Sequence, residues 1–122
     1  MLGHISFGVT DFGRSLAFYD SALATLGMVR VWTGADSAGY GMAGGGDKFA
    51  IKRRDGAHPP GPGFHLAFDA PDRAAVDAFH RAALAAGGCD NGGPGLRPHY
   101  GPTYYAGFVF DPDGYALEAV HQ

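Results

Sequence analysis

An internal repeat constrains the fold of this chain more than any other feature of its sequence. Residues His4 to Gly27 reappear 61 positions later as His65 to Gly88, and the two segments align without a gap. Nine of the 24 aligned positions are identical, including the histidine that opens each segment and the glycine that ends it. Such a repeat indicates two copies of one supersecondary unit, neither of which buries its apolar face alone. We therefore expect two similar units packed together.

Each copy has the pattern of a strand followed by a helix. Over residues 4–9 apolar side chains alternate with small or polar ones, which is typical of a strand with one covered face. Asp11 is a candidate N-cap for a helix over residues 13–26, where apolar residues recur at spacings of three and four. The second copy repeats this plan, with a strand that opens at His65 and a helix after Asp72.

The remaining apolar runs predict the other strands. We expect them at residues 29–33, around 40–42, at 49–54, near 104–110 and at 115–120. A Gly/Pro-rich connector at residues 56–63 separates the two units, because neither a helix nor a central strand tolerates it. The sequence thus predicts an α+β fold with a single domain over residues 1–122. Its first βαβββ module is residues 1–55, and its second is residues 64–122.

Size and charge limit the classes of function. A chain of 122 residues with a net charge of −3 lacks the electrostatic footprint of a nucleic-acid-binding protein, since its basic residues are scattered apart from Lys52-Arg53-Arg54. We expect that run to be a solvated strand end rather than an anion clamp. The single cysteine, Cys89, excludes an internal disulfide framework. No apolar run approaches the roughly 20 residues that span a bilayer, and no space precedes the first strand for a signal peptide. We expect a cytoplasmic protein whose partners are a small molecule and a second copy of itself.

Three residues share a position that suits a metal ligand. His4 and His65 open equivalent strands, and Glu118 lies in the last predicted strand. Each is on the face opposite the larger apolar residues, among small neighbours, where an unpaired carboxylate is costly. Two imidazoles and a carboxylate bind Zn, Ni, Mn or Fe as divalent ions and leave positions open for a substrate. The sequence predicts a divalent-metal site formed by these three residues.

A simpler interpretation treats the same residues as structural. Each histidine would then be a hydrogen-bonded core residue, and Glu118 a solvated strand residue. That interpretation suits a histidine taken alone. Two histidines in equivalent positions, together with an inward carboxylate, favour the metal site instead.

The motifs around these residues resemble those of the vicinal oxygen chelate superfamily. This superfamily includes glyoxalase I, bleomycin- and fosfomycin-resistance proteins, extradiol dioxygenases and methylmalonyl-CoA epimerase. The resemblance covers essentially the whole chain and rests on the opening His4 strand, Ser15-Leu-Ala-Phe-Tyr19, the His65-Leu-Ala-Phe68 strand and Asp111-Pro-Asp-Gly-Tyr-Ala-Leu-Glu118. It implies two βαβββ modules that form a half-open β-barrel around a metal, with His4, His65 and Glu118 as the ligands.

In one respect the chain departs from the glyoxalase I pattern. That pattern implies a fourth, acidic ligand on the last strand of the first module, where it takes part in proton transfer. Here the strand reads Phe49-Ala-Ile-Lys-Arg-Arg54 and contains no carboxylate. Because abstraction of a proton next to a carbonyl needs a base within hydrogen-bond reach, the departure argues against orthodox glyoxalase I chemistry.

Aromatic and basic residues before the last hairpin are candidates for a pocket wall. Loops held on a rigid scaffold often carry such binding residues. An equally good interpretation is that these aromatic residues only cover the barrel, and core packing is the expected role of the one tryptophan. The substrate-binding candidates are Arg97, His99, Tyr100, Tyr104 and Tyr105, with Trp32 and Tyr40 from the first module.

The leading hypothesis is a divalent-metal-dependent enzyme that acts on a small substrate through two oxygens bound to the metal. A lyase, an isomerase, a ring-opening transferase and a dioxygenase all fit this description. The alternative is a metal-free protein of the bleomycin-resistance type that binds or sequesters a small molecule, and a third possibility is a degenerate regulatory or structural relative. The resemblance implies a homodimer. The sequence is compatible with modules paired within one chain and with modules swapped between chains, where His4 would share a metal with His65 and Glu118 of the partner subunit.

Overall fold

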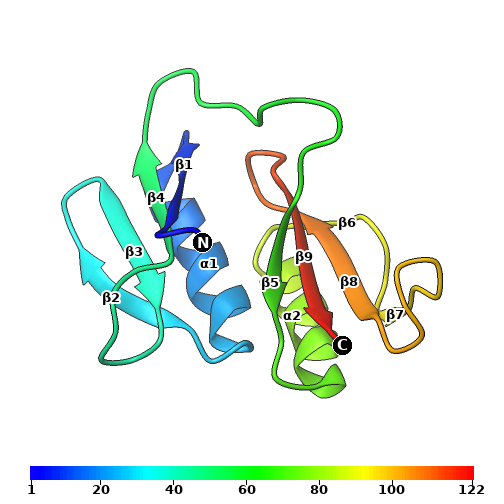
Figure 1. Ribbon diagram of the computed structural model, residues 1–122. Coiled ribbons are helices and arrows are strands. Elements are labelled where there is room, and N and C mark those ends of the chain that lie inside the picture. The colour runs from blue at the N-terminus through cyan, green and yellow to red at the C-terminus, as the bar shows by residue number, and fades with distance from the viewer.

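The computed structural model describes residues 1–122 and contains two helices and nine strands (Figure 1). The elements of the first module are β1 (Ile5–Val9), α1 (Phe12–Ala24), β2 (Val29–Thr33), β3 (Ser37–Gly41) and β4 (Phe49–Arg53). Those of the second module are β5 (Leu66–Asp69), α2 (Arg73–Ala85), β6 (Cys89–Asp90), β7 (Gly95–Leu96), β8 (Tyr105–Phe110) and β9 (Ala116–His121). The two modules stand side by side, and the connector between β4 and β5 runs as a long loop from one to the other.

The strands form two separate sheets. Sheet 1 has the order β1-β4-β3-β2, and sheet 2 has the order β5-β9-β8-β6, with β7 also paired to β8. In each sheet the first strand pairs in parallel with the last strand of its module, whereas the other pairs are antiparallel. The predicted α+β class and the common plan of the two modules are confirmed. The two sheets do not join into a closed barrel within one chain, since β1 and β5 are both edge strands.

Both helices begin where the sequence predicts an N-cap. The side chain of Asp11 accepts a hydrogen bond from the backbone N–H of Arg14, and Asp72 accepts one from Ala75. These caps satisfy backbone donors that have no partner within the first helical turn. Neither helix, at 13 residues each, is long and apolar enough to cross a membrane.

A single hydrophobic core connects the two modules. Its 21 buried residues come from both helices and both sheets. The ring of Phe7 on β1 stacks on Tyr115 at 4.1 Å between centroids, and Phe49 on β4 meets the edge of Phe68 on β5 at 5.5 Å. Because aromatic side chains bury large apolar areas, these contacts stabilise the packing of one module against the other.

The predicted hairpin turn at residues 111–114 also ties the modules together. Asp111 is buried, accepts backbone N–H bonds from Asp113 and Tyr115, and accepts the phenol O–H of Tyr19 on α1. The Tyr115 hydroxyl in turn donates to the carbonyl oxygen of Gly8 on β1. Burial raises the pKa of the Asp111 carboxyl and raises that of the Tyr19 phenol well above its usual range. This turn therefore fixes the second module on the first strand and helix of the chain.

The structure differs from the prediction in some element boundaries. Strand β3 covers Ser37–Gly41, which is earlier than the predicted strand around 40–42, and it contains two glycines. A Cβ on Gly41 would come within 2.3 Å of the carbonyl oxygen of Gly46, so the close approach of the returning chain requires glycine there. The two-residue strands β6 and β7 were not predicted, because they are too short to show an alternating pattern.

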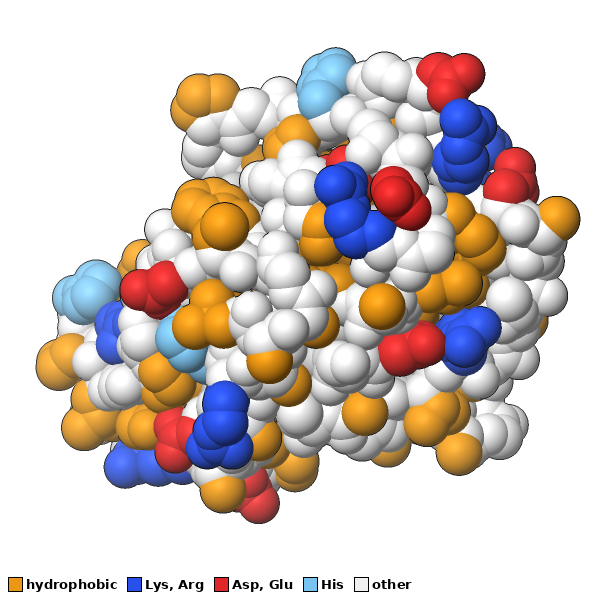
Figure 2. Space-filling view, turned by 180° about the vertical axis from the view of Figure 1, so that it is seen from behind, with side chains coloured by type: hydrophobic (Ala, Val, Ile, Leu, Met, Phe, Trp, Pro, Cys, Tyr) orange, Lys and Arg blue, Asp and Glu red, His pale blue; other side chains and the backbone are white.

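The surface carries no large area of one charge on the face seen from behind. Figure 2 shows Lys and Arg side chains interspersed with Asp and Glu on that face. The net charge of the chain is −3. This distribution agrees with the absence of an electrostatic footprint for nucleic acid in the sequence.

Candidate functional site

Glu118 lies on the face of sheet 2 that α2 leaves uncovered. Its neighbours across the sheet are Ala67 on β5 and Phe108 on β8. The adjacent residue of β8, Gly107, faces α2, because a Cβ there would contact Val76 of that helix. Since successive side chains of a strand point to opposite faces, Glu118 points away from the helix. We call the uncovered face of each sheet its open face.

The structure brings His65 and Glu118 together. The distance from His65 Nε2 to Glu118 Oε2 is 3.1 Å. The Glu118 side chain is 1% exposed, whereas that of His65 is 53% exposed. A buried carboxylate is costly unless it is paired, and the imidazole provides this pairing while its ring still contacts solvent.

Tyr104 completes the surroundings of Glu118. Its phenol O–H donates a hydrogen bond to Glu118 Oε1, the oxygen that does not face His65. Burial, followed by this hydrogen bond, raises the pKa of Tyr104 to about 12. The phenol is therefore neutral near pH 7 and acts as a donor that fixes the orientation of the carboxylate.

His4 lies elsewhere, at the start of β1 in sheet 1. Within one chain no group of three or more His, Cys, Asp or Glu side chains is placed to hold a metal ion. The pair of His65 and Glu118 does suit such an ion, because two donor atoms bound at about 2.1 Å to one ion lie about 3 Å apart. One chain thus supplies two of the three predicted ligands at one place and presents the third on the other sheet.

Aromatic residues from the loop before β8 extend from Tyr104 toward solvent. Tyr100 lies 5.2 Å from Tyr104 between ring centroids, and His99 lies 4.2 Å from Tyr100. The Arg97 guanidinium lies over the ring of Phe108, 5.3 Å from its centroid, and Phe108 is the cross-strand neighbour of Glu118. Four of the candidate residues therefore form one side of the open face of sheet 2.

Two other candidates point elsewhere. Tyr105 follows Tyr104 in the chain, so its side chain lies on the opposite face, where its hydroxyl donates to Asp77 of α2. Tyr40 is fully buried in the core, and its hydroxyl donates to Asp20 of α1. The structure places both side chains outside the open faces, because strand alternation directs them toward the helices.

The open face of sheet 1 contains a polar hollow of about 470 Å³. Trp32 is part of its lining and is 39% exposed, so it does not lie in the core where the sequence pattern places it. His4 and Ser6 line one side of the hollow, and Lys52 and Arg54 come from β4 and the residue after it. Lys52 thus lines the hollow, whereas the sequence predicts a solvated strand end there.

Ala50 occupies the position in sheet 1 that corresponds to Glu118 in sheet 2. In the repeat Ser6 aligns with Ala67, and these two residues pair across their sheets with Ala50 and Glu118 respectively. The register thus identifies the residue that stands where a second carboxylate would lie. The side chain at this position of β4 is the methyl group of Ala50. The strand, which the sequence predicts to lack an acid, therefore also lacks one at the position on the open face.

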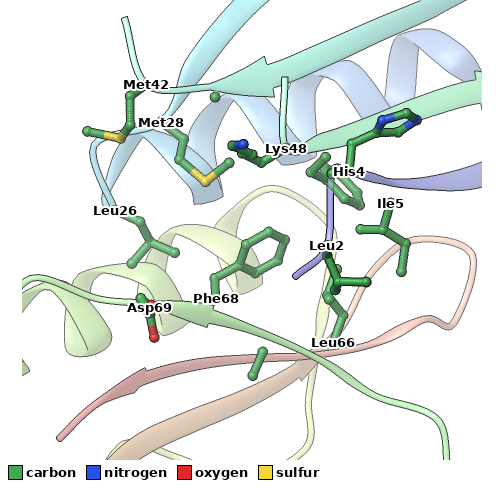
Figure 3. A pocket seen from close by; sticks show the side chains of 14 residues that line it. Leu2, His4, Ile5, Leu26, Met28, Met42, Lys48, Leu66, Phe68 and Asp69 are labelled. Carbon is green, nitrogen blue, oxygen red and sulfur yellow. The ribbon is translucent and has the colours of Figure 1, made fainter. Parts of the chain in front are cut away.

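A second, mainly apolar hollow of about 390 Å³ is lined by residues of both modules (Figure 3). Leu26, Met28 and Phe68 point into it, and His4 stands at its edge with the ring directed away from Phe68. The hollow lies between the edge strands β1 and β5, so these strands are near each other in space without being hydrogen-bonded.

The chain matches the model of the Glyoxalase/Bleomycin resistance protein/Dioxygenase superfamily over residues 1–119. This match spans nearly the whole sequence and agrees with the two modules and the placement of Glu118 in the last strand. The chain belongs to this superfamily. None of the curated proteins matches it in sequence.

Solved structures support the same assignment. A glyoxalase/bleomycin resistance protein from Albidiferax ferrireducens T118 is 33% identical, with a TM-score of 0.85 over 100% of this chain and 98% of that one. A glyoxalase-related enzyme from Fulvimarina pelagi is 23% identical, with a TM-score of 0.78 over 100% and 88% of the two chains. The E144Q mutant of glyoxalase I from Zea mays is 22% identical, with a TM-score of 0.71 over 96% and 45%. The last two show the shared fold alone.

Proposed function

We propose that this protein is a divalent-metal-dependent enzyme that acts on a small molecule, with His4, His65 and Glu118 as the metal ligands. The observation that carries the proposal is the almost fully buried Glu118 carboxylate, which faces the half-exposed imidazole of His65 at 3.1 Å. Carboxylate and imidazole together are the donor types that divalent transition metals prefer. Tyr104 supports this role because its hydrogen bond to the other carboxylate oxygen fixes the ligand, as partners of metal ligands commonly do.

The third ligand, in this proposal, comes from a second copy of the chain. Strands β1 and β5 each have one side without a hydrogen-bonded neighbour, and such edges pair readily with another chain. His4 directly precedes β1, and His65 directly precedes β5. Pairing of β1 from one copy beside β5 of the other would place His4 next to His65 and Glu118 of the partner subunit. A homodimer would then hold two equivalent sites.

The residues around the proposed site would bind and orient the substrate. A divalent ion held there would supply a Lewis acid for oxygens of the substrate. Tyr104 would keep the Glu118 carboxylate in one orientation, while Tyr100 and His99 would exclude water from one side of the bound molecule. Orthodox glyoxalase I chemistry fits poorly, since Ala50 stands at the position that corresponds to Glu118 in sheet 1 and cannot accept a proton. We also propose a cytoplasmic location, because a reducing compartment keeps the exposed Cys89 thiol unpaired.

Metal binding by variants tests this function. Protein freed of metal is titrated with Mn(II), Fe(II), Ni(II) and Zn(II), and the affinity is compared among the parent, His65→Ala and Glu118→Gln. We expect each variant to lose at least about tenfold in affinity for the preferred ion. His58→Ala changes an exposed histidine of the connector and serves as the control that binds as the parent does. Equal affinity of the parent and His65→Ala would refute the proposed ligand set.

A metal-free binding protein is the second candidate function. The neighbouring, mutually tilted rings of His99, Tyr100 and Tyr104 favour it, because they would hold an aromatic or cationic ligand without a metal. Purification without chelators, followed by measurement of metal content and reconstitution, separates the two candidates. Protein that contains no metal and binds none on reconstitution would favour the binding protein.

A further inference from the structure

The polar hollow on sheet 1 carries two cations that form no ion pair with a carboxylate of the chain. Lys52 and Arg54 both line it, and Lys52 forms no ion pair or side-chain hydrogen bond within the chain. The only bond of the Arg54 guanidinium is to the carbonyl oxygen of Arg53. Arg53, which points to the other face of β4, instead pairs with Asp55 at 2.9 Å. The cations of the hollow are therefore available to a ligand.

The spacing of these cations favours a single anionic group. Lys52 and Arg54 are two residues apart on one extended segment, so their side chains leave the same face about 7 Å apart. Positive charges on neighbouring side chains repel each other, and an anion bound by both relieves the repulsion. Asp36 and Asp47 also line the hollow without pairing with either cation, and they disfavour a second negative charge on the ligand.

Trp32 gives the same hollow an aromatic wall. It pairs across the sheet with Gly39, where a Cβ would come within 2.1 Å of the indole Nε1. Glycine at this position thus lets the indole lie against the sheet, and 39% of the residue is exposed. An exposed indole stacks well on a planar group of a ligand.

Ala50 lies in the floor of the hollow and is 2% exposed. Its cross-strand neighbours are Ser6 on one side and Gly39 on the other, so the centre of the open face carries only small side chains. A flat molecule would have its place beside the Trp32 indole, which covers Gly39, and next to the two cations. Such concave sites with few placed polar groups are typical of small-molecule binding.

We infer that this hollow binds a small planar organic monoanion, an aromatic or conjugated carboxylate, with its carboxylate at Lys52 and Arg54 and its ring against Trp32. The role of this molecule as the substrate rests on the proposed function, whereas the inference that it binds here is independent of that function. In a dimer paired through β1 and β5, His4 would lie at the edge of the hollow and also at the metal. The ring of the ligand would then extend from the cations toward the ion.

Benzoate and the uncharged benzamide test the binding directly. Trp32 is the only tryptophan of the chain, so its fluorescence reports on this hollow, and calorimetry gives the affinity independently. We expect saturable binding of benzoate, with benzamide at least about tenfold weaker. Phenyl phosphate, a dianion, should bind more weakly than benzoate. Absence of saturable benzoate binding, equal binding of benzamide, or tighter binding of phenyl phosphate would each overturn the inference.

Two variants of neighbouring residues locate the anion. Lys52→Gln should weaken benzoate about tenfold and leave benzamide unchanged. Arg53→Gln, on the other face of β4, is the matched control and should bind benzoate as the parent does. Circular dichroism and thermal unfolding confirm that both variants are folded. Unchanged benzoate affinity in Lys52→Gln, or an equal loss in Arg53→Gln, would contradict the placement of the carboxylate.

Failure of this inference can be told apart from failure of the proposed function. The benzoate titration is carried out on metal-free protein and repeated with His65→Ala, whose change lies on sheet 2. Benzoate binding without any metal binding would leave the anion site standing and remove the metal-dependent function. Metal binding without benzoate binding would leave the metal-dependent function standing and remove the anion site.

Discussion

The open faces of the two sheets derive from one repeated plan and have opposite chemistry. At corresponding central positions sheet 2 has the carboxylate of Glu118, and sheet 1 has the methyl group of Ala50. Sheet 2 surrounds its carboxylate with His65 and Tyr104, whereas sheet 1 places Lys52 and Trp32 around small side chains. The buried sides of the two sheets are alike, since both pack aromatic and aliphatic residues against a helix.

This difference indicates that packing constrains the residues on the buried sides of the sheets, whereas the residues on the open faces can differ between the modules. Substitutions on a packed face create cavities or steric overlap, whereas an open face tolerates a change of charge. One module can therefore keep metal-ligand chemistry while the other acquires features that recognise a ligand. A dimer that brings an open face of each kind together would combine the two.

The turn at Asp111 holds the two modules in a fixed position relative to each other. Asp111→Ala removes the acceptor for two backbone N–H groups and for the Tyr19 phenol. Because buried donors are then left without partners, we expect the free energy of unfolding to fall by about 3 kcal/mol. Urea unfolding measures this loss. Asp55→Ala, at an exposed carboxylate, should change stability by less than about 0.5 kcal/mol, and equal losses in the two variants would contradict the role of the turn.

Tyr19 should make part of this stability depend on pH. Its folded-state pKa is raised well above 10.0, chiefly by burial. Its contribution is therefore fully present below the pKa of the unfolded phenol and is lost as the pH rises through the folded value. Tyr19→Phe should cost about 2 kcal/mol near neutral pH. Urea unfolding gives the free energy of unfolding at about pH 8 and about pH 11. Between these pH values it should decrease less for Tyr19→Phe than for the parent, and an equal decrease would refute this linkage.

Ala50→Glu would make the two open faces more alike. Ala50 is 2% exposed, so the larger side chain must displace its neighbours, and the free energy of unfolding should fall by about 2 kcal/mol. Benzoate binding should be lost, since the new carboxylate would compete for Lys52. Ala50→Gln has the same size without the charge and should weaken benzoate less. Calorimetry compares the two, and benzoate affinity like that of the parent in Ala50→Glu would show that Ala50 does not face the anion site.

Much of this fold could be predicted from local sequence signals. The repeat predicted two modules of one kind, and Asp11 and Asp72 predicted the helix starts because capping depends on neighbouring residues only. Alternation in the last strand predicted that Glu118 lies on the face opposite Leu117 and Ala119, and it does. Each of these signals spans a few residues and needs no knowledge of distant contacts.

The rest depended on contacts between segments far apart in the chain. Tyr104 and Tyr105 are adjacent in sequence, and only the register of β8 decides that the first meets Glu118 and the second meets α2. The bond from Tyr19 to Asp111 joins residues of different modules. The exposure of Trp32 follows from its place over Gly39. The sequence around each of these residues does not indicate which distant residue its side chain contacts.

The central claim is that a metal site is shared between two copies, and mixing two defective variants tests it most directly. His4→Ala and Glu118→Gln should each bind little metal alone. After subunit exchange, random pairing gives hybrid dimers with one intact site, so about a quarter of the metal capacity of the parent should return. His65→Ala mixed with Glu118→Gln, both changed on the same sheet, should recover none. Metal content that stays at the level of the separate variants after exchange of His4→Ala with Glu118→Gln would contradict the shared site.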